Sequence, residues 1–73
     1  MKESKFIRSF NIEQLTDDYI QWLRTYGEGR NFNGLRFGQS LFSKYCNPSE
    51  TFPELFYAEG VKKAYDIAYM ELM

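Results

Sequence analysis

The clearest hydrophobic pattern lies in the first third of the chain and has the spacing of a helix. Its apolar positions, three or four residues apart, are Ile12, Leu15, Tyr19, Trp22, Leu23 and Tyr26. At about 100° per residue they form a single stripe, which is typical of a helix with one buried face. Asn11, followed three residues later by Gln14, fits an N-terminal cap, and Thr16 is a competing cap. Gly27 provides the expected stop, so we predict a helix over residues 12–26.

A loop and a second helix follow. Residues 27–34 contain three glycines and two asparagines, which tolerate positive φ and therefore indicate a loop. We expect Phe32 to turn inward and anchor this loop. A helix is predicted over residues 35–46, because Asn47-Pro48 disfavours a further helical turn.

The last third of the chain predicts one short and one long helix. Thr51-Phe52-Pro53-Glu54 has the form of a capping box with a proline at the first helical position, which indicates a single helical turn near residues 53–58. Helical spacing then recurs at Val61, Ala64, Tyr65, Ala68 and Leu72. This spacing predicts a helix over residues 61–72, in which Ala64 and Ala68 would allow a neighbouring helix to approach closely.

Residues 1–10 have a different character. They are charged, with Phe6, Ile7 and Phe10 as their large apolar residues, and would form either an extended arm that packs on the body or a frayed end. We therefore predict the all-α fold class. Residues 1–73 would form one compact domain of three principal helices and a short helical turn.

The predicted core draws on every helix. Its central side chains are expected to be Tyr19, Trp22, Leu23, Phe37, Leu41, Phe42, Phe56, Tyr65 and Leu72. Gly38, inside the second helix, costs about 0.5–1 kcal/mol relative to alanine, so close packing should offset it. We expect that packing to be against an aromatic residue of the first helix, such as Trp22.

The size and aromatic content of the chain suggest that part of its apolar surface is covered by another protein molecule. With 73 residues the chain would bury only about 60% of the surface exposed on unfolding. It nevertheless contains seven Phe, six Tyr and one Trp, more apolar surface than so small a domain hides easily. Self-association or a protein partner would cover the excess.

Charge and cysteine content limit the kinds of partner and the cellular compartment that we expect. Nine basic against ten acidic residues give no support to nonspecific binding of nucleic acid or membrane. The lone Cys46 cannot form an intrachain disulfide and is expected to be a small buried hydrophobe. No apolar run could span a membrane, and the N-terminus lacks the apolar segment of a signal peptide. The Met1 start and short length suggest a complete small gene product, and the single cysteine favours a reducing cytoplasm.

Several chemistries find no support in the sequence. Without histidine there is no His-based catalytic triad and no His-containing zinc site, and one cysteine cannot build a Cys₄ site. The glycines of residues 27–34 match neither a dinucleotide-binding nor a P-loop spacing. Ser40 and Lys44 lie one helical turn apart, but a serine–lysine dyad needs a buried lysine. Glu13, Asp17 and Asp18 are better explained by the helix dipole than by a metal. We expect no enzyme, cofactor or metal site.

A polar surface without carboxylates is the strongest functional feature. The helix over residues 35–46 and the preceding loop contribute Arg30, Asn31, Asn33, Arg36, Gln39, Ser40, Ser43 and Lys44, which are the candidate binding residues. Glu28 is the sole acid between Asp18 and Glu50. These side chains could form a solvated helix face, a surface for a protein, or a surface for the phosphates and base edges of nucleic acid.

Two segments carry a resemblance. Tyr19-Ile-Gln-Trp22-Leu, and after the loop Leu35-Arg36-Phe37-Gly38-Gln39-Ser40-Leu41-Phe42, resemble small uncharacterised accessory proteins of tailed bacteriophages. Those carry an aromatic-rich first helix followed by Arg-Phe/Tyr-Gly-Gln-x-Leu. The likeness covers about residues 19–57 and departs at Ser43-Lys44 and in the aromatic C-terminal helix. It implies an intracellular phage protein that binds and redirects a host protein, and it supplies no catalytic residue.

A second likeness is to helix-turn-helix modules, in which a Tyr-x-x-Trp helix precedes a Phe-Gly-x-x-Leu recognition helix. Here no middle helix fits between Gly27 and Gly34, and no wing strands follow.

The sequence thus favours a noncatalytic protein-binding accessory protein, phage-encoded, that modulates or inhibits a host or phage protein. Contact would use residues 30–44 or exposed apolar groups such as Ile20, Ile67 and Met70. The alternative is a small nucleic-acid-binding protein. It would use Arg24, Arg30, Arg36, Gln39 and Lys44.

Overall fold

The computed structural model describes residues 4–73 and has four helices. They are α1 (Ile12–Tyr26), α2 (Phe37–Tyr45), α3 (Pro53–Phe56) and α4 (Val61–Leu72). Over these residues there is no β-strand, only an isolated antiparallel bridge between Phe6 and Cys46. The all-α class is confirmed, with three principal helices and one short helical turn.

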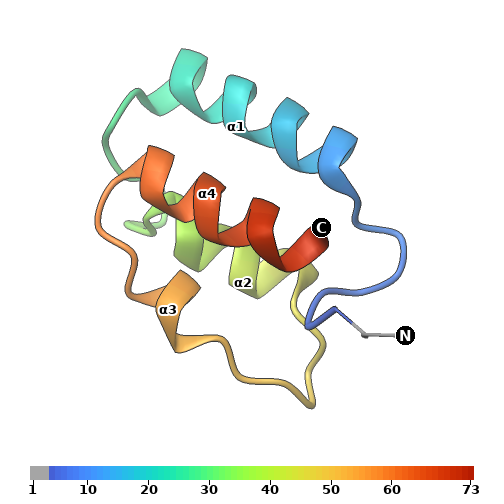
Figure 1. The fold of residues 1–73 in the computed structure, drawn as a ribbon. Helices are drawn as coiled ribbons and strands as arrows, with labels where there is room; N and C mark the ends of the chain where they lie inside the picture. Colours follow the sequence, from blue (N-terminus) through green and yellow to red (C-terminus); the bar gives the residue numbers. More distant parts are fainter. Residues whose placement is uncertain (1–3) are drawn as a thin grey trace.

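The helices form two layers (Figure 1). Helix α1 runs antiparallel to α4 and packs along it, and its Trp22 also contacts Phe37 of α2; helices α2 and α3 pack against α4 and against each other. None of the four helices is long and apolar enough to cross a membrane.

Local sequence features set the ends of α1, as predicted. The Asn11 side-chain oxygen accepts a hydrogen bond of 2.8 Å from the Gln14 N–H, which caps the helix. At the other end Gly27 has a φ of 61° and its N–H donates to the Leu23 carbonyl. Thr16 is not the cap; its hydroxyl lies 3.1 Å from the Tyr65 hydroxyl and joins α1 to α4.

The helices α2 and α3 are shorter than predicted. Arg36 is the cap of α2 rather than a helical residue, and its N–H donates to the Gln39 side-chain oxygen at 2.9 Å. The predicted capping box of α3 is wrong, because Phe52 stands at the cap position and no side chain caps the helix. The Phe52 ring is buried in the core, so tertiary packing fixes this turn in place of Thr51.

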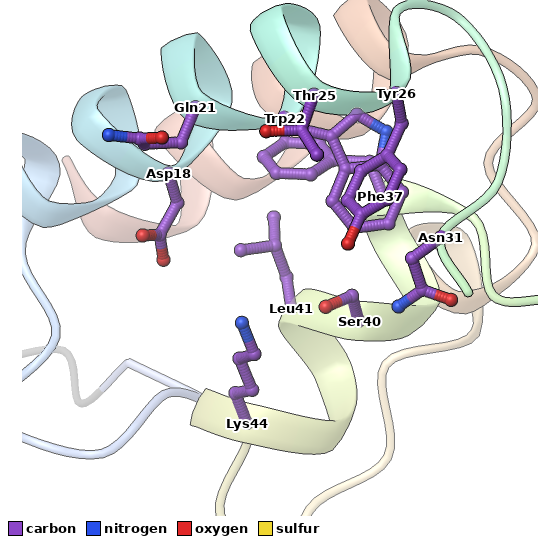
Figure 2. Close-up of a pocket in the computed structure, with 10 residues that line it drawn as sticks. All are labelled: Asp18, Gln21, Trp22, Thr25, Tyr26, Asn31, Phe37, Ser40, Leu41 and Lys44. Atoms are coloured by element: carbon purple, nitrogen blue, oxygen red, sulfur yellow. The ribbon is translucent and has the colours of Figure 1, made fainter. Parts of the chain in front are cut away.

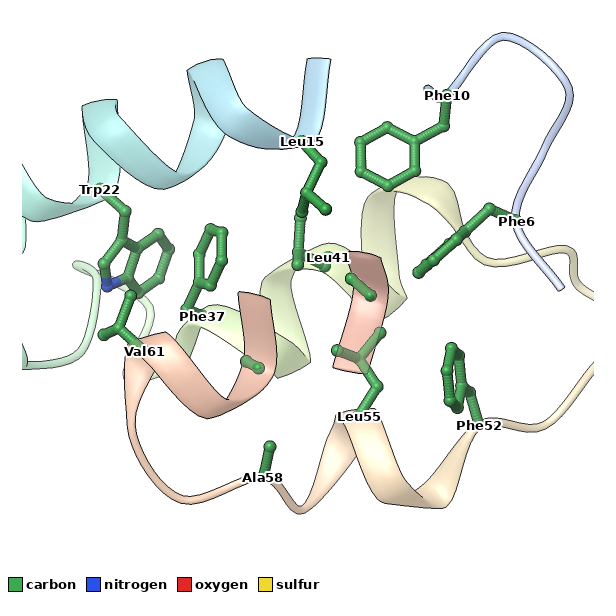
Figure 3. Packing of buried hydrophobic residues seen from close by; sticks show 12 residues of the cluster. Phe6, Phe10, Leu15, Trp22, Phe37, Leu41, Phe52, Leu55, Ala58 and Val61 are labelled. Atoms are coloured by element: carbon green, nitrogen blue, oxygen red, sulfur yellow. The ribbon is translucent and has the colours of Figure 1, made fainter. Parts of the chain in front are cut away.

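Leu15, Leu41 and Leu55 form the centre of the core, and aromatic rings surround them (Figure 3). Of the predicted core residues, Trp22, Phe37 and Leu41 are buried, while Tyr19, Phe42, Phe56, Tyr65 and Leu72 are partly buried. Leu23 was wrongly placed in the core and is 37% exposed. It lies about 100° around α1 from Trp22, at the edge of the buried stripe.

The N-terminal arm packs on the body over its described residues, 4–10, while residues 1–3 lie outside the described part of the chain. Phe6 and Phe10 are buried, and the Phe10 ring stacks on Tyr45 with 3.9 Å between centroids. The arm is also held by its backbone: Ile7 donates to the Tyr45 carbonyl at 2.7 Å, and Asn47 donates to the Lys5 carbonyl at 2.9 Å. Over residues 4–10 the arm is therefore packed on the body, with a turn at residues 8–9.

Gly38 packs closely, but not against Trp22. A Cβ on Gly38 would clash with the Leu55 carbonyl oxygen and lie 3.3 Å from the Ala64 Cβ. The expected partner was wrong because Gly38 faces α3 and α4, whereas its neighbour Phe37 contacts Trp22 with 5.3 Å between ring centroids. The small side chain of Ala64 admits α2, as its spacing predicted.

Candidate functional site

The loop between α1 and α2 is held by its own hydrogen bonds. The Asn31 side-chain oxygen accepts from the N–H groups of Asn33 and Leu35, each at 2.9 Å. The Asn31 backbone bonds to Gly34 and Leu35, and the Arg30 guanidinium donates to the Gly34 carbonyl at 2.8 Å. Arg30 and Asn31, both predicted to bind a partner, therefore also determine the shape of the loop.

Phe32 projects from this loop into solvent. Its side chain is 93% exposed, so the expectation that it turns inward is wrong. The turn closes through Asn31 and Gly34, which leaves the residue after Asn31 on the outside. Its ring packs edge-on against Tyr26, at 5.6 Å between centroids.

A groove lies between α1 and α2 and was not predicted (Figure 2). Its volume is about 230 Å³ and its floor is apolar, formed by Trp22, Phe37 and Leu41. The α1 wall consists of Asp18, Gln21, Thr25 and Tyr26, and the opposite wall of Asn31, Ser40 and Lys44. The three- and four-residue spacing of Asp18, Gln21 and Thr25, beside the apolar stripe, could have revealed this wall from the sequence.

Ser40 belongs to this groove rather than to an outer helix face. It was expected on the polar surface, but it is only 5% exposed. Figure 2 shows its hydroxyl directed into the groove. Among residues 4–73 no side-chain oxygen or nitrogen is both buried and unpartnered, so the Ser40 hydroxyl, which bonds to none of these residues, is open to the groove.

The two charged groups of the groove have different surroundings. The Asp18 carboxylate accepts from the Tyr45 hydroxyl at 2.6 Å and from the Gln14 amide at 3.1 Å. Burial and this contact with Asp18 raise the pKa of Tyr45 to about 12. Lys44 is exposed and forms no ion pair; in the described part of the chain the one ion pair joins Lys62 and Asp66. An exposed Lys44 also lacks the burial that a serine–lysine dyad requires.

The other predicted binding residues lie elsewhere. Arg30 and Arg36 line a separate hollow of about 180 Å³ beside Gly60 and Val61, at the start of α4. Gln39 caps α2. Asn33 and Ser43 are exposed and line none of these hollows. Of the eight candidates, the structure brings Asn31, Ser40 and Lys44 together in the groove, and Arg30 and Arg36 together in the hollow beside α4.

No group of His, Cys, Asp or Glu within residues 4–73 is arranged to hold a metal ion. Cys46 is partly buried, and burial together with the nearby Glu50 raises the pKa of its thiol. The chain matches no family model, no curated protein and no solved structure.

Proposed function

We propose that this protein is a noncatalytic binding protein that engages a partner protein through the loop between α1 and α2. The observation that carries the proposal is the exposure of Phe32, 93% accessible on a hydrogen-bonded loop. Burying such a ring in an interface is worth about 1.5–3 kcal/mol. Aromatic side chains, Phe among them, are enriched in the buried centres of protein interfaces.

The rigidity of the loop supports this function. Association normally requires the ordering of loops and side chains, at a cost in free energy. Here Asn31 and Arg30 already fix the backbone on both sides of Phe32. A partner would therefore meet a ring carried on a backbone that is ordered before binding.

The expected partner follows from the resemblance to phage accessory proteins. We infer a host or phage protein whose activity the binding inhibits or redirects in the host cytoplasm. A second copy of this chain is the other partner that an exposed ring could meet, and light scattering at increasing concentration would detect it.

Nucleic-acid binding is less well supported. Arg30 and Arg36 line the hollow beside α4, whereas Lys44 lines the groove between α1 and α2. Phosphate recognition favours basic groups clustered on one face. A gel-shift titration at two salt concentrations tests this alternative, because phosphate contacts weaken steeply with salt.

The central experiment compares Phe32→Ala with Tyr57→Ala in affinity capture from a bacterial host lysate. Tyr57 is also a large exposed ring, 70% accessible, but it lies after α3. Circular dichroism should show that both variants remain folded. We expect Phe32→Ala to lose the partner and Tyr57→Ala to keep it. Equal capture by both variants would mean that the loop is not the interface.

A further inference from the structure

We infer that the groove between α1 and α2 binds a segment of the partner protein in which an apolar side chain is followed by an aspartate or glutamate. This inference rests on the proposed function and names the chemistry of the partner. It starts from Ser40, which is 95% buried, directed into the groove and without a hydrogen-bond partner among residues 4–73. Because this hydroxyl opens into the groove, a group bound there would hydrogen-bond with it in place of water.

The donors around Ser40 favour an anion. Lys44 lies one helical turn from Ser40, which separates their Cβ atoms by about 5–6 Å. The Asn31 side-chain oxygen is occupied by two backbone N–H groups, and this orients the amide so that its nitrogen faces Ser40 (Figure 2). A hydroxyl, an amide N–H and an ammonium group thus border the same side of the groove.

Asp18 limits the charge of that anion. Both of its carboxylate oxygens accept hydrogen bonds from the protein, from Tyr45 and Gln14, so it does not need Lys44 as a partner. Its negative charge still stands on the opposite wall and would repel a dianion such as phosphate more than a single carboxylate. The groove therefore suits a carboxylate better than a phosphate.

The floor and the size of the groove favour a peptide side chain. Trp22, Phe37 and Leu41 offer apolar contacts beneath the donors. The volume, about 230 Å³, is below the range of about 300–1,000 Å³ that is usual for small-molecule and cofactor sites. One apolar side chain with a neighbouring carboxylate would occupy both parts of the groove.

The groove also adjoins the proposed contact loop. Tyr26 lines the groove and contacts the Phe32 ring edge-on at 5.6 Å. A partner that covers Phe32 would therefore reach the groove without crossing another element. This continuity is the reason for assigning the groove to a protein segment.

The test is a titration of the ¹⁵N-labelled protein with two dipeptides, acetyl-Phe-Glu-amide and acetyl-Phe-Gln-amide, followed by NMR. We expect shifts at the Trp22 indole N–H and at Ser40, and about tenfold tighter binding of the Glu peptide, the size of effect that a charge-assisted hydrogen bond gives. Lys44→Gln should remove that preference, whereas Lys63→Gln, an exposed lysine on α4, should keep it. Ser40→Ala should weaken both peptides.

Two results would overturn the inference. One is equal binding of the Glu and Gln peptides; the other is binding of inorganic phosphate at these residues without binding of the peptides. The outcome is separable from that of the proposed function, because Phe32 does not line the groove. Partner capture lost in Phe32→Ala but unchanged in Lys44→Gln and Ser40→Ala would reject the groove alone. Peptide binding by the groove with unchanged capture by Phe32→Ala would reject the loop alone.

Discussion

Gly38 of α2 lies so close to the backbone carbonyl of Leu55 in α3 that a hydrogen atom is the only side chain that fits between them. The obstacle is backbone, which cannot rotate away as a flexible side chain can. The Cβ of Ala64 closes the same space from α4, at 3.3 Å from where a Cβ of residue 38 would lie. Three helices therefore meet at one glycine.

Gly38→Ala should destabilise the fold. Alanine favours a helix by up to about 1 kcal/mol over glycine, but overpacking costs about 1–3 kcal/mol, and here it also separates α2 from α3. We expect a net loss in the free energy of unfolding, measured by urea denaturation. The matched control is Ser43→Ala on the exposed side of α2, which should change stability by no more than about 0.5 kcal/mol. Equal stability of the two variants would contradict the close contact.

Tyr45 should make stability depend on alkaline pH. Its pKa of about 12 in the folded protein lies above the value of about 10 in an unfolded chain. The folded state thus holds this proton more tightly. The resulting contribution to stability is complete below about pH 10 and is lost as the pH rises through about 12.

The measurement is urea denaturation at about pH 8 and about pH 11, with Tyr45→Phe as the variant. Phenylalanine keeps the stacking on Phe10 but has no proton to lose. We expect the wild type to lose more stability between the two pH values than Tyr45→Phe does. Tyr57→Phe, at an exposed ring, should behave as the wild type. The same pH dependence in all three proteins would contradict the prediction.

Phe6→Ala should unfold the protein or nearly so. The Phe6 ring is 2% exposed and contacts both Phe10 and Phe52, at 4.9 and 5.7 Å between centroids. Truncation of a buried phenylalanine costs about 3–5 kcal/mol, which is comparable to the whole stability of a small domain. Thermal melting followed by circular dichroism checks this, with Arg8→Ala at an exposed position of the same arm as the control. A melting temperature equal to that of Arg8→Ala would show that the arm is not part of the core.

Asn31→Ala should loosen the loop while the helices persist. It removes the acceptor of two hydrogen bonds, from the N–H groups of Asn33 and Leu35, each worth about 0.5–1.5 kcal/mol. Hydrogen exchange at these two amides should become faster, whereas exchange in α1 should not change. Asn31→Asp retains an acceptor oxygen and should retain the protection. Unchanged exchange in Asn31→Ala would mean that the loop is held by other contacts.

The sequence predicts best those elements whose ends depend on neighbouring residues. Asn11 and Gly27 mark the ends of α1 through interactions within four residues, so both were predictable. Thr51 has the local pattern of a helix cap, but the prediction that it caps α3 is wrong, because burial of the Phe52 ring determines where α3 begins. Phe6 could not be assigned to the core for the same reason, since its neighbours Phe10 and Phe52 meet only in the folded chain.

The sequence predicts which segment holds the candidate site, but not how the side chains of that segment are arranged. A helical wheel placed Ser40 beside Ser43 on one polar face, yet α1 covers Ser40 and leaves Ser43 exposed. Phe32 was expected inside because large apolar side chains are usually buried. Its exposure follows from how Asn31 closes the turn, which no hydrophobic pattern records.

The arm has a further consequence, because it brings the ends of the described chain together. The Lys5 N–H donates to the Glu71 carboxylate at 2.7 Å, although 66 positions separate them in sequence. The first and last described residues therefore lie near each other in space. A short peptide could join residue 4 to residue 73, and the chain could be opened instead in the exposed turn at residues 48–50 without cutting any helix. Such a circularly permuted chain would retain the core, the loop with Phe32 and the groove beside it.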